Sequence, residues 1–203
     1  MRELLAFLPV AALVIVTPGP DTAITLRATL LGGRRAGVLT ALGVISGQAC
    51  WTVAASAGAT ALLLASEPAF MAVKLAGAAF LIYLGLHALW TALRGGGAPP
   101  AVGRGPRLDG RTAYRQGLIS DLSNPKMAAF FTSLLPQFSS SFAGMLALGL
   151  LFCALTFAWL ALYAAAAARA GDVLRRARVR RTLEGCTGAV LVALGLRLAT
   201  ERH

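Results

Sequence analysis

A series of long apolar runs constrains this chain more than any other feature. We expect six membrane spans, at about residues 4–26, 38–64, 69–93, 113–135, 142–168 and 183–199. Each run is close to the ~20 residues that a helix needs to cross a bilayer. Only 13% of the residues are charged and 57% are hydrophobic, whereas a soluble domain carries about 25% charged residues. The sequence therefore predicts an all-α membrane protein with six transmembrane helices.

The basic residues are unevenly distributed between these spans. Most of the 19 lysines and arginines lie in the first, third and fifth connections: Arg27, Arg34, Arg35, Arg94, Arg104, Arg107, Arg111, Arg115, Arg169, Arg175, Arg176, Arg178, Arg180 and Arg181. Basic connections stay in the cytoplasm, so we expect both termini on the outer side of the inner (plasma) membrane. The net charge of +11 then reflects topology within a lipid bilayer, and we expect no nucleic-acid partner. The first span should be retained, because no small-residue cleavage pattern precedes its prolines.

A Gly- and Pro-rich connection at residues 95–112 divides the chain into two units, residues 1–94 and 113–203. Each unit contains three of the expected spans. Because three is odd, the second unit must enter the membrane in the opposite orientation to the first. We therefore expect two inverted three-helix repeats, an arrangement found in many transporters.

The first span of each unit contains a proline motif. Thr17-Pro18-Gly19-Pro20-Asp21 interrupts one, and Asn124-Pro125-Lys126 interrupts the other. Proline lacks the N–H of a helical hydrogen bond and disfavours helix at the preceding residue. We expect helices 1 and 4 to be broken near the middle of the membrane, where irregular backbone must be buried in protein or line a wet cavity.

Each break should start a new half-helix. Pro20 and Pro125 suit a first helical turn, and Asn124 is a good N-cap. The N-terminal ends of the two half-helices favour a carboxylate, and the carbonyls released by the preceding helices could accept an ammonium group. A site that can bind both a carboxylate and an ammonium group suits a zwitterion such as an amino acid. The alternative is that the prolines only bend the bundle.

Three ionisable residues lie deep in the expected spans: Asp21, Asp121 and Lys126. Such residues are functional candidates by default. Either carboxylate could bind a substrate amine or carry a coupling proton, and either could pair with Lys126; a structural ion pair is the alternative.

Gln48, Lys74 and Tyr83 are weaker candidates for lining a path. Gln48 and Tyr83 could equally form hydrogen bonds between helices, and Lys74 could extend its amine to the membrane surface. Gly43 and Gly47 permit close helix packing.

No motif for an enzyme, metal or cofactor site is present in the sequence. Cys50, Cys153 and Cys186 are isolated in apolar context, and they form no metal-binding or disulfide pattern. A phosphate-binding loop and a Ser/His/Asp set are also missing. We expect a protein that is not an enzyme and that uses no metal or cofactor.

Three groups of residues carry a resemblance over nearly the whole chain. They are Pro18-Gly19-Pro20-Asp21 with Gly33-Arg34-Arg35-Ala36-Gly37, Gly43 and Gly47; the run from Lys74 to Gly85; and Gly117-Leu118-Ile119 with Asn124-Pro125-Lys126, Phe130-Phe131 and Pro136-Gln137-Phe138. In these motifs the chain resembles the LysE/RhtB family of amino-acid exporters. Asp121 departs from the family pattern, in which an uncharged residue is more usual.

The resemblance implies a six-span inner-membrane secondary transporter that exports amino acids, driven by the proton-motive force. By the family pattern the matching site positions are Pro18, Gly19, Pro20, Asp21, Asn124, Pro125 and Lys126. The expected partners are an amino-acid substrate and a proton, and a homo-oligomer is possible. Two alternatives stay open: an exporter of another small solute, such as a cation or a metal, and a membrane scaffold that transports nothing.

Overall fold

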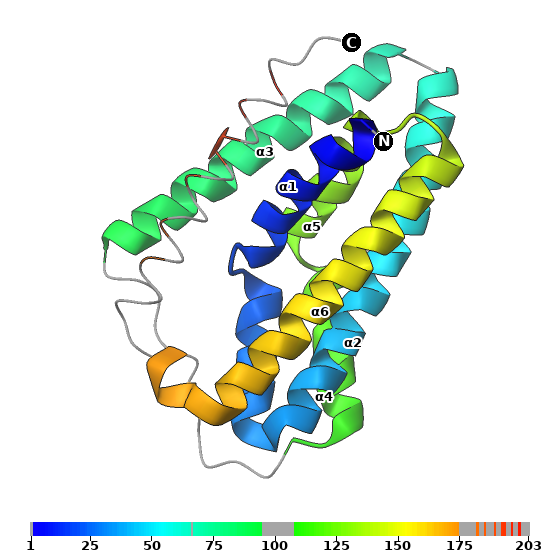
Figure 1. Cartoon of the computed structure of the whole chain (residues 1–203). Helices are drawn as coiled ribbons and strands as arrows, with labels where there is room; N and C mark the ends of the chain where they lie inside the picture. Colours follow the sequence, from blue (N-terminus) through cyan, green and yellow to red (C-terminus); the bar gives the residue numbers. More distant parts are fainter. Residues whose placement is uncertain are drawn as a thin grey trace.

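The computed structural model describes residues 2–65, 67–94 and 108–174, and the single residues Thr182, Gly185, Ala189, Val192, Ala193, Leu196 and Ala199. Within this part of the chain every regular element is a helix and no strand occurs, in agreement with the expected all-α class. The elements are α1 (Arg2–Val16), α2 (Pro20–Ala65), α3 (Glu67–Leu93), α4 (Gly110–Leu122), α5 (Pro125–Ala129), the π-helix η1 (Phe130–Leu134), the 3-10 helix η2 (Leu135–Gln137) and α6 (Phe142–Leu174) (Figure 1). Most of the connection 95–112 and of the expected sixth span, 183–199, lies outside the described residues.

The chain reverses direction inside α2. Figure 1 shows α1 and the first arm of α2 running from one end of the bundle to the other, after which the second arm runs back along the full length. The two arms meet at Gly33, whose φ of 75° breaks the helical backbone. Glycine adopts positive φ without a steric penalty. The chain thus reverses within the expected first connection, between residues 26 and 38, but the expected span bounds are too short, because helix continues on both sides of Gly33.

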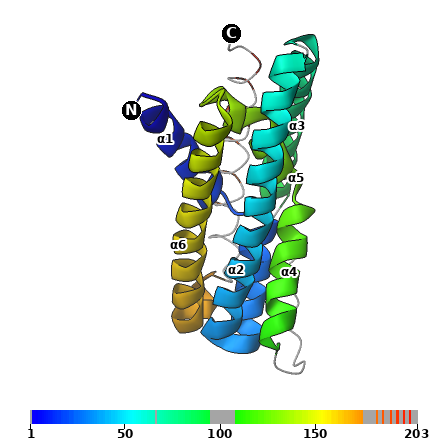
Figure 2. The same ribbon diagram turned by 90° about the vertical axis from the view of Figure 1, so that its right-hand side faces the viewer.

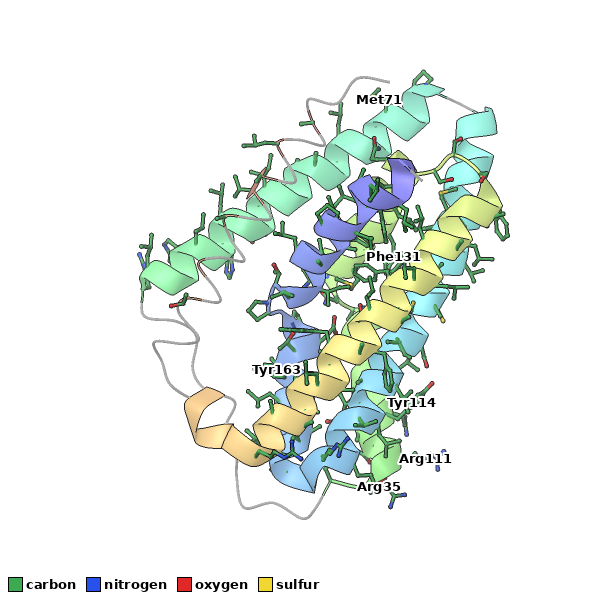
Figure 3. All side chains as sticks on the ribbon, viewed as in Figure 1. Arg35, Met71, Arg111, Tyr114, Phe131 and Tyr163 are labelled. Atoms are coloured by element: carbon green, nitrogen blue, oxygen red, sulfur yellow. The ribbon has the colours of Figure 1, made fainter. Side chains whose placement is uncertain are left out.

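The remaining helices complete an elongated bundle (Figures 1 and 2). The chain returns through α3, runs up through α4, α5, η1 and η2, and returns again through α6. Consequently the first interrupted helical path, α1 with the first arm of α2, and the second, α4 with α5, run in opposite directions. Figure 3 shows Arg35 and Arg111 at one end of the bundle and Met71 at the other.

The second arm of α2 packs directly against α4 through glycines. A Cβ atom on Gly43 would overlap the backbone carbonyl oxygen of Tyr114, and one on Gly117 would overlap that of Thr40. These contacts bring backbone against backbone, so the expectation that Gly43 serves close packing is confirmed. The contact matters for function because it fixes the position of α4, which leads into the second proline motif.

An aromatic core lies between α1, η1 and α6. Phe7, Phe130, Phe131 and Phe152 are fully buried there, and the rings of Phe130 and Phe152 stack with centroids 4.3 Å apart. By length and apolar composition, two of the described helical stretches can cross a membrane: Pro20–Gly58 and Phe142–Arg169. The apolar part of α1, Leu4–Val16, is shorter.

Candidate functional site at the two helix breaks

The first proline motif separates two helices. α1 ends at Val16 and α2 begins at Pro20, with the three residues between them outside any helix. Pro18 and Gly19 therefore lie in the break. Asp21 lies in the first turn of α2 and is 7% exposed. Free N–H groups and the positive end of the helix dipole favour a carboxylate at this position.

The second proline motif has the same local form. α4 ends at Leu122, and α5 begins at Pro125 with Asn124 as its N-cap. The Asn124 side chain accepts a hydrogen bond from the backbone N–H of Lys126 at 3.0 Å. This bond satisfies one of the N–H groups that a helix start leaves open.

The two breaks contact each other through the carboxylate of Asp21. The Asn124 side chain donates a hydrogen bond to Asp21 Oδ2 at 2.6 Å, and the Ser120 hydroxyl donates to Oδ1 at 2.9 Å. Both donors belong to the second half of the chain. A carboxylate in the first half is thus held by α4 and by the cap of α5.

Lys126 makes the reciprocal contact. Its ammonium group donates to the carbonyl oxygens of Val14 at 3.2 Å and Thr17 at 3.0 Å, which lie at the C-terminal end of α1. A cation is favoured there because those carbonyls lack helical partners and form the negative end of the dipole. The sequence had suggested these carbonyls as acceptors for an external ammonium group, whereas the structure places the chain's own lysine on them. Asp21 and Asp121 are both close enough to interact electrostatically with Lys126.

Asp121 lies beside this group in a different environment. Its side chain is fully buried and packs on Gly47, where an added Cβ would lie 2.6 Å from Asp121 Oδ2. Gly47 therefore makes room for the carboxyl group as well as for helix packing. The Trp51 indole N–H donates to the backbone carbonyl of Asp121 at 3.4 Å.

Gln48 also lies at this position, with 2% of its surface exposed. Its amide lies beside the Asp121 carboxyl group, but its Nε2 is turned toward the sulfur of Met127, 3.6 Å away. Among the described residues, no donor reaches either carboxyl oxygen of Asp121 or the Oε1 of Gln48.

Of the other two weaker candidates, Tyr83 is not brought to this group. Tyr83 is 60% exposed on α3, with its ring 6.3 Å from that of His87, whereas Asp21, Asn124 and Lys126 at the breaks are buried. The side chain of Lys74 lies outside the described part of the structure. Within the described chain, no three His, Cys, Asp or Glu side chains are grouped so that they could hold a metal ion.

Sequence reasoning missed Ser120, and it assigned the carbonyls at the end of the first helix to an external ammonium group rather than to Lys126. Ser120 carried a weak signal, because residues four apart share one side of a helical path, and Asn124 is four residues further on. Nothing in the sequence pairs Lys126 with Val14 and Thr17, because every residue has a carbonyl group. Taken together, the site presents a carboxylate and an ammonium group, each at a helix end of matching polarity, and each held by the other half of the chain.

Comparison with known proteins places these motifs in one family. The model of a family described as LysE type translocator matches residues 12–202. The chain is 27% identical to an uncharacterized membrane protein, YrhP, of Bacillus subtilis, over 97% of this chain and 98% of the relative.

Two further relatives match a shorter stretch. A leucine efflux protein of Enterobacter sp. is 32% identical over 63% of this chain and 59% of that protein. A chemotactic transduction protein, ChpE, of Pseudomonas aeruginosa is 36% identical over 59% of this chain and 56% of that protein. No solved structure matches the chain.

Proposed function

Because the chain belongs to the LysE type translocator family, we propose that it exports amino acids or close derivatives from the cytoplasm. The two helix breaks form its solute site, and efflux is coupled to protons. One observation carries the proposal: Asp21 and Lys126, an acid and a base, lie at helix ends of matching polarity, in a buried group shared by both halves of the chain. The leucine efflux relative supports the substrate class.

The contacts suggest how a zwitterion binds. Its ammonium group replaces that of Lys126 on the carbonyls of Val14 and Thr17, or pairs with Asp21. Its carboxylate pairs with the displaced Lys126. The carbonyls of Val14 and Thr17 exchange one ammonium group for another, and Lys126 gains a carboxylate partner, so no buried charge is left unpaired, which would be costly.

The architecture supports transport by alternating access. The two interrupted helical paths run in opposite directions (Figure 1), as expected if residues 1–94 and 113–203 are inverted repeats joined by the connection 95–112. Broken helices at the interface of such repeats are typical of secondary transporters. Rocking one half against the other would then expose the site to each side in turn.

The charge distribution supports an orientation. Arg35 and Arg111 lie at one end of the bundle (Figure 3), and basic ends stay in the cytoplasm. We therefore place this end in the cytoplasm and both termini outside, in the inner (plasma) membrane. The membrane relatives are consistent with this location.

The ChpE relative favours a second candidate, in which the protein acts in signalling and transports nothing. An efflux assay distinguishes export from signalling. The purified protein is reconstituted in proteoliposomes that are loaded with a panel of radiolabelled amino acids, beginning with leucine. We expect efflux of at least one amino acid, accelerated by an imposed pH gradient and lost in Asp21→Asn. Asp109→Asn is the matched control, because Asp109 makes an exposed cap at the start of α4, and it should transport normally. Absence of efflux across the panel rejects the substrate class; the same vesicles loaded with inorganic cations test the export of another solute.

A further inference from the structure

The two buried aspartates of the site differ in how fully they are bonded. Each carboxyl oxygen of Asp21 accepts a hydrogen bond, one from Ser120 and one from Asn124. Asp121 is more deeply buried, yet neither of its carboxyl oxygens accepts a hydrogen bond from any residue that the structure describes. Asp21 is therefore satisfied as an anion, whereas Asp121 is not.

Gln48, the neighbour of Asp121, also has a buried oxygen that accepts no hydrogen bond in the described structure. The Gln48 amide lies beside this carboxyl group, and with its N–H turned toward Met127 its Oε1 is left without a donor in the described structure. Two adjacent acceptors in an apolar interior are costly, because each has lost its bond to water. One proton on the Asp121 carboxyl removes the deficit, because a protonated carboxyl group becomes a donor.

The described charged groups around Asp121 do not stabilise its ionised form in place of that proton. Among the described residues, Asp21 on α2, Lys126 on α5 and Cys153 on α6 are the titratable groups that interact with Asp121. Asp21 is a second acid and disfavours another negative charge beside it. The Lys126 ammonium group is bonded to the carbonyls of α1, and Cys153 is a buried thiol without charge.

We propose that Asp121 and Gln48 form the proton site of the transporter, in which the protonated carboxyl group of Asp121 donates a hydrogen bond to Gln48 Oε1. This inference rests on the proposed export function for its role in coupling. The proton comes from water on one side of the membrane and is released to water on the other. Asp21 and Lys126 belong to the proposed solute site.

The geometry also suggests how the proton site and the solute site communicate. When Asp121 loses its proton, Lys126 is the neighbouring cation that can compensate the new charge. Movement of Lys126 toward Asp121 frees the carbonyls of Val14 and Thr17 for the ammonium group of a solute. Proton release and solute binding are linked in this way.

Infrared difference spectroscopy of the purified protein tests the proton without any substrate. The carbonyl stretch of a buried protonated carboxylic acid should be present at neutral pH, be lost in Asp121→Asn, and persist in the matched variant Asp21→Asn. A wild-type spectrum without this band, or a band that persists in Asp121→Asn, overturns the assignment. This result is independent of whether any amino acid is transported.

Transport measurements with radiolabelled leucine, or whichever amino acid the panel identifies, test the coupling. Asp121→Asn mimics the permanently protonated form. We expect it to lose efflux driven by a pH gradient while it still exchanges labelled for unlabelled amino acid across the membrane. If Asp121→Asn responds to the gradient like the wild type, Asp121 is not the coupling group. Gln48→Leu, which removes the acceptor, should shift the pH of half-maximal efflux downward, and an upward shift contradicts the proposed bond.

Discussion

Asn124 joins the two helix breaks, so its replacement by alanine gives the sharpest test of the site. The side chain makes two bonds at once: it caps α5 through the N–H of Lys126, and it donates to Asp21 Oδ2 at 2.6 Å. Loss of a cap costs about 0.5–2 kcal/mol. Leaving a buried acceptor unsatisfied costs about 1–3 kcal/mol. Because the two losses are separate bonds, Asn124→Ala should lower the free energy of unfolding by about 2–4 kcal/mol.

A second substitution at the same position separates the two losses. Serine at position 124 retains a capping oxygen but is too short to donate to Asp21, so Asn124→Ser should lose only the second contribution. Equilibrium unfolding of the purified protein in detergent measures both variants against the wild type. If both variants unfold within about 0.5 kcal/mol of the wild type, as ordinary surface substitutions do, the contact between the breaks does not stabilise the fold and the reasoning is refuted.

Three further predictions concern packing, pH and transport. Gly117→Ala should cost about 1–3 kcal/mol, because its Cβ would overlap a carbonyl of α2, whereas Gly58→Ala, with open space around it, should be neutral or stabilising in the same thermal unfolding assay. Hydrogen bonds from Thr112 and nearby N–H groups lower the pKa of Asp109. The Asp109 cap of α4 is therefore fully formed above the ordinary carboxyl pKa, and it weakens as the pH falls through the lowered pKa of Asp109. Amide hydrogen exchange at the start of α4, corrected for the intrinsic exchange rate, should therefore accelerate as the pH falls through this lowered pKa, and Asp109→Asn should remove this pH dependence. Lys126→Met should abolish amino-acid efflux in proteoliposomes while the protein still inserts, and wild-type efflux in this variant would exclude Lys126 from the solute site.

The local features of the site follow from the sequence because they depend on neighbouring residues. A proline that cannot continue a helix can still begin one, and the structure has helix starts at Pro20 and Pro125. Asn124 is likewise recognisable as a cap from its position before Pro125. These inferences need no knowledge of the rest of the fold.

The contacts between the halves did not follow in the same way. The partners of Lys126 lie 109 and 112 residues away and are backbone carbonyls, so no residue type marks them. The reversal between residues 26 and 38 was expected, but the extent of the helix around it was not, because one glycine with positive φ, Gly33, is enough to turn the chain. The π-helix η1, in which Phe130 and Phe131 pack against Phe152, was not predicted from the sequence either.

The distance in sequence between the two breaks has a consequence for biosynthesis. Asn124 is separated from Asp21 by 103 residues, and at ribosomal speeds of about 5–20 residues per second it follows after roughly 5–20 s. During that interval the nascent chain carries an acidic group and an interrupted helix without the side chains that later bind them. Insertion into the bilayer must therefore tolerate a polar intermediate, and the first half becomes complete only when the second has been synthesised.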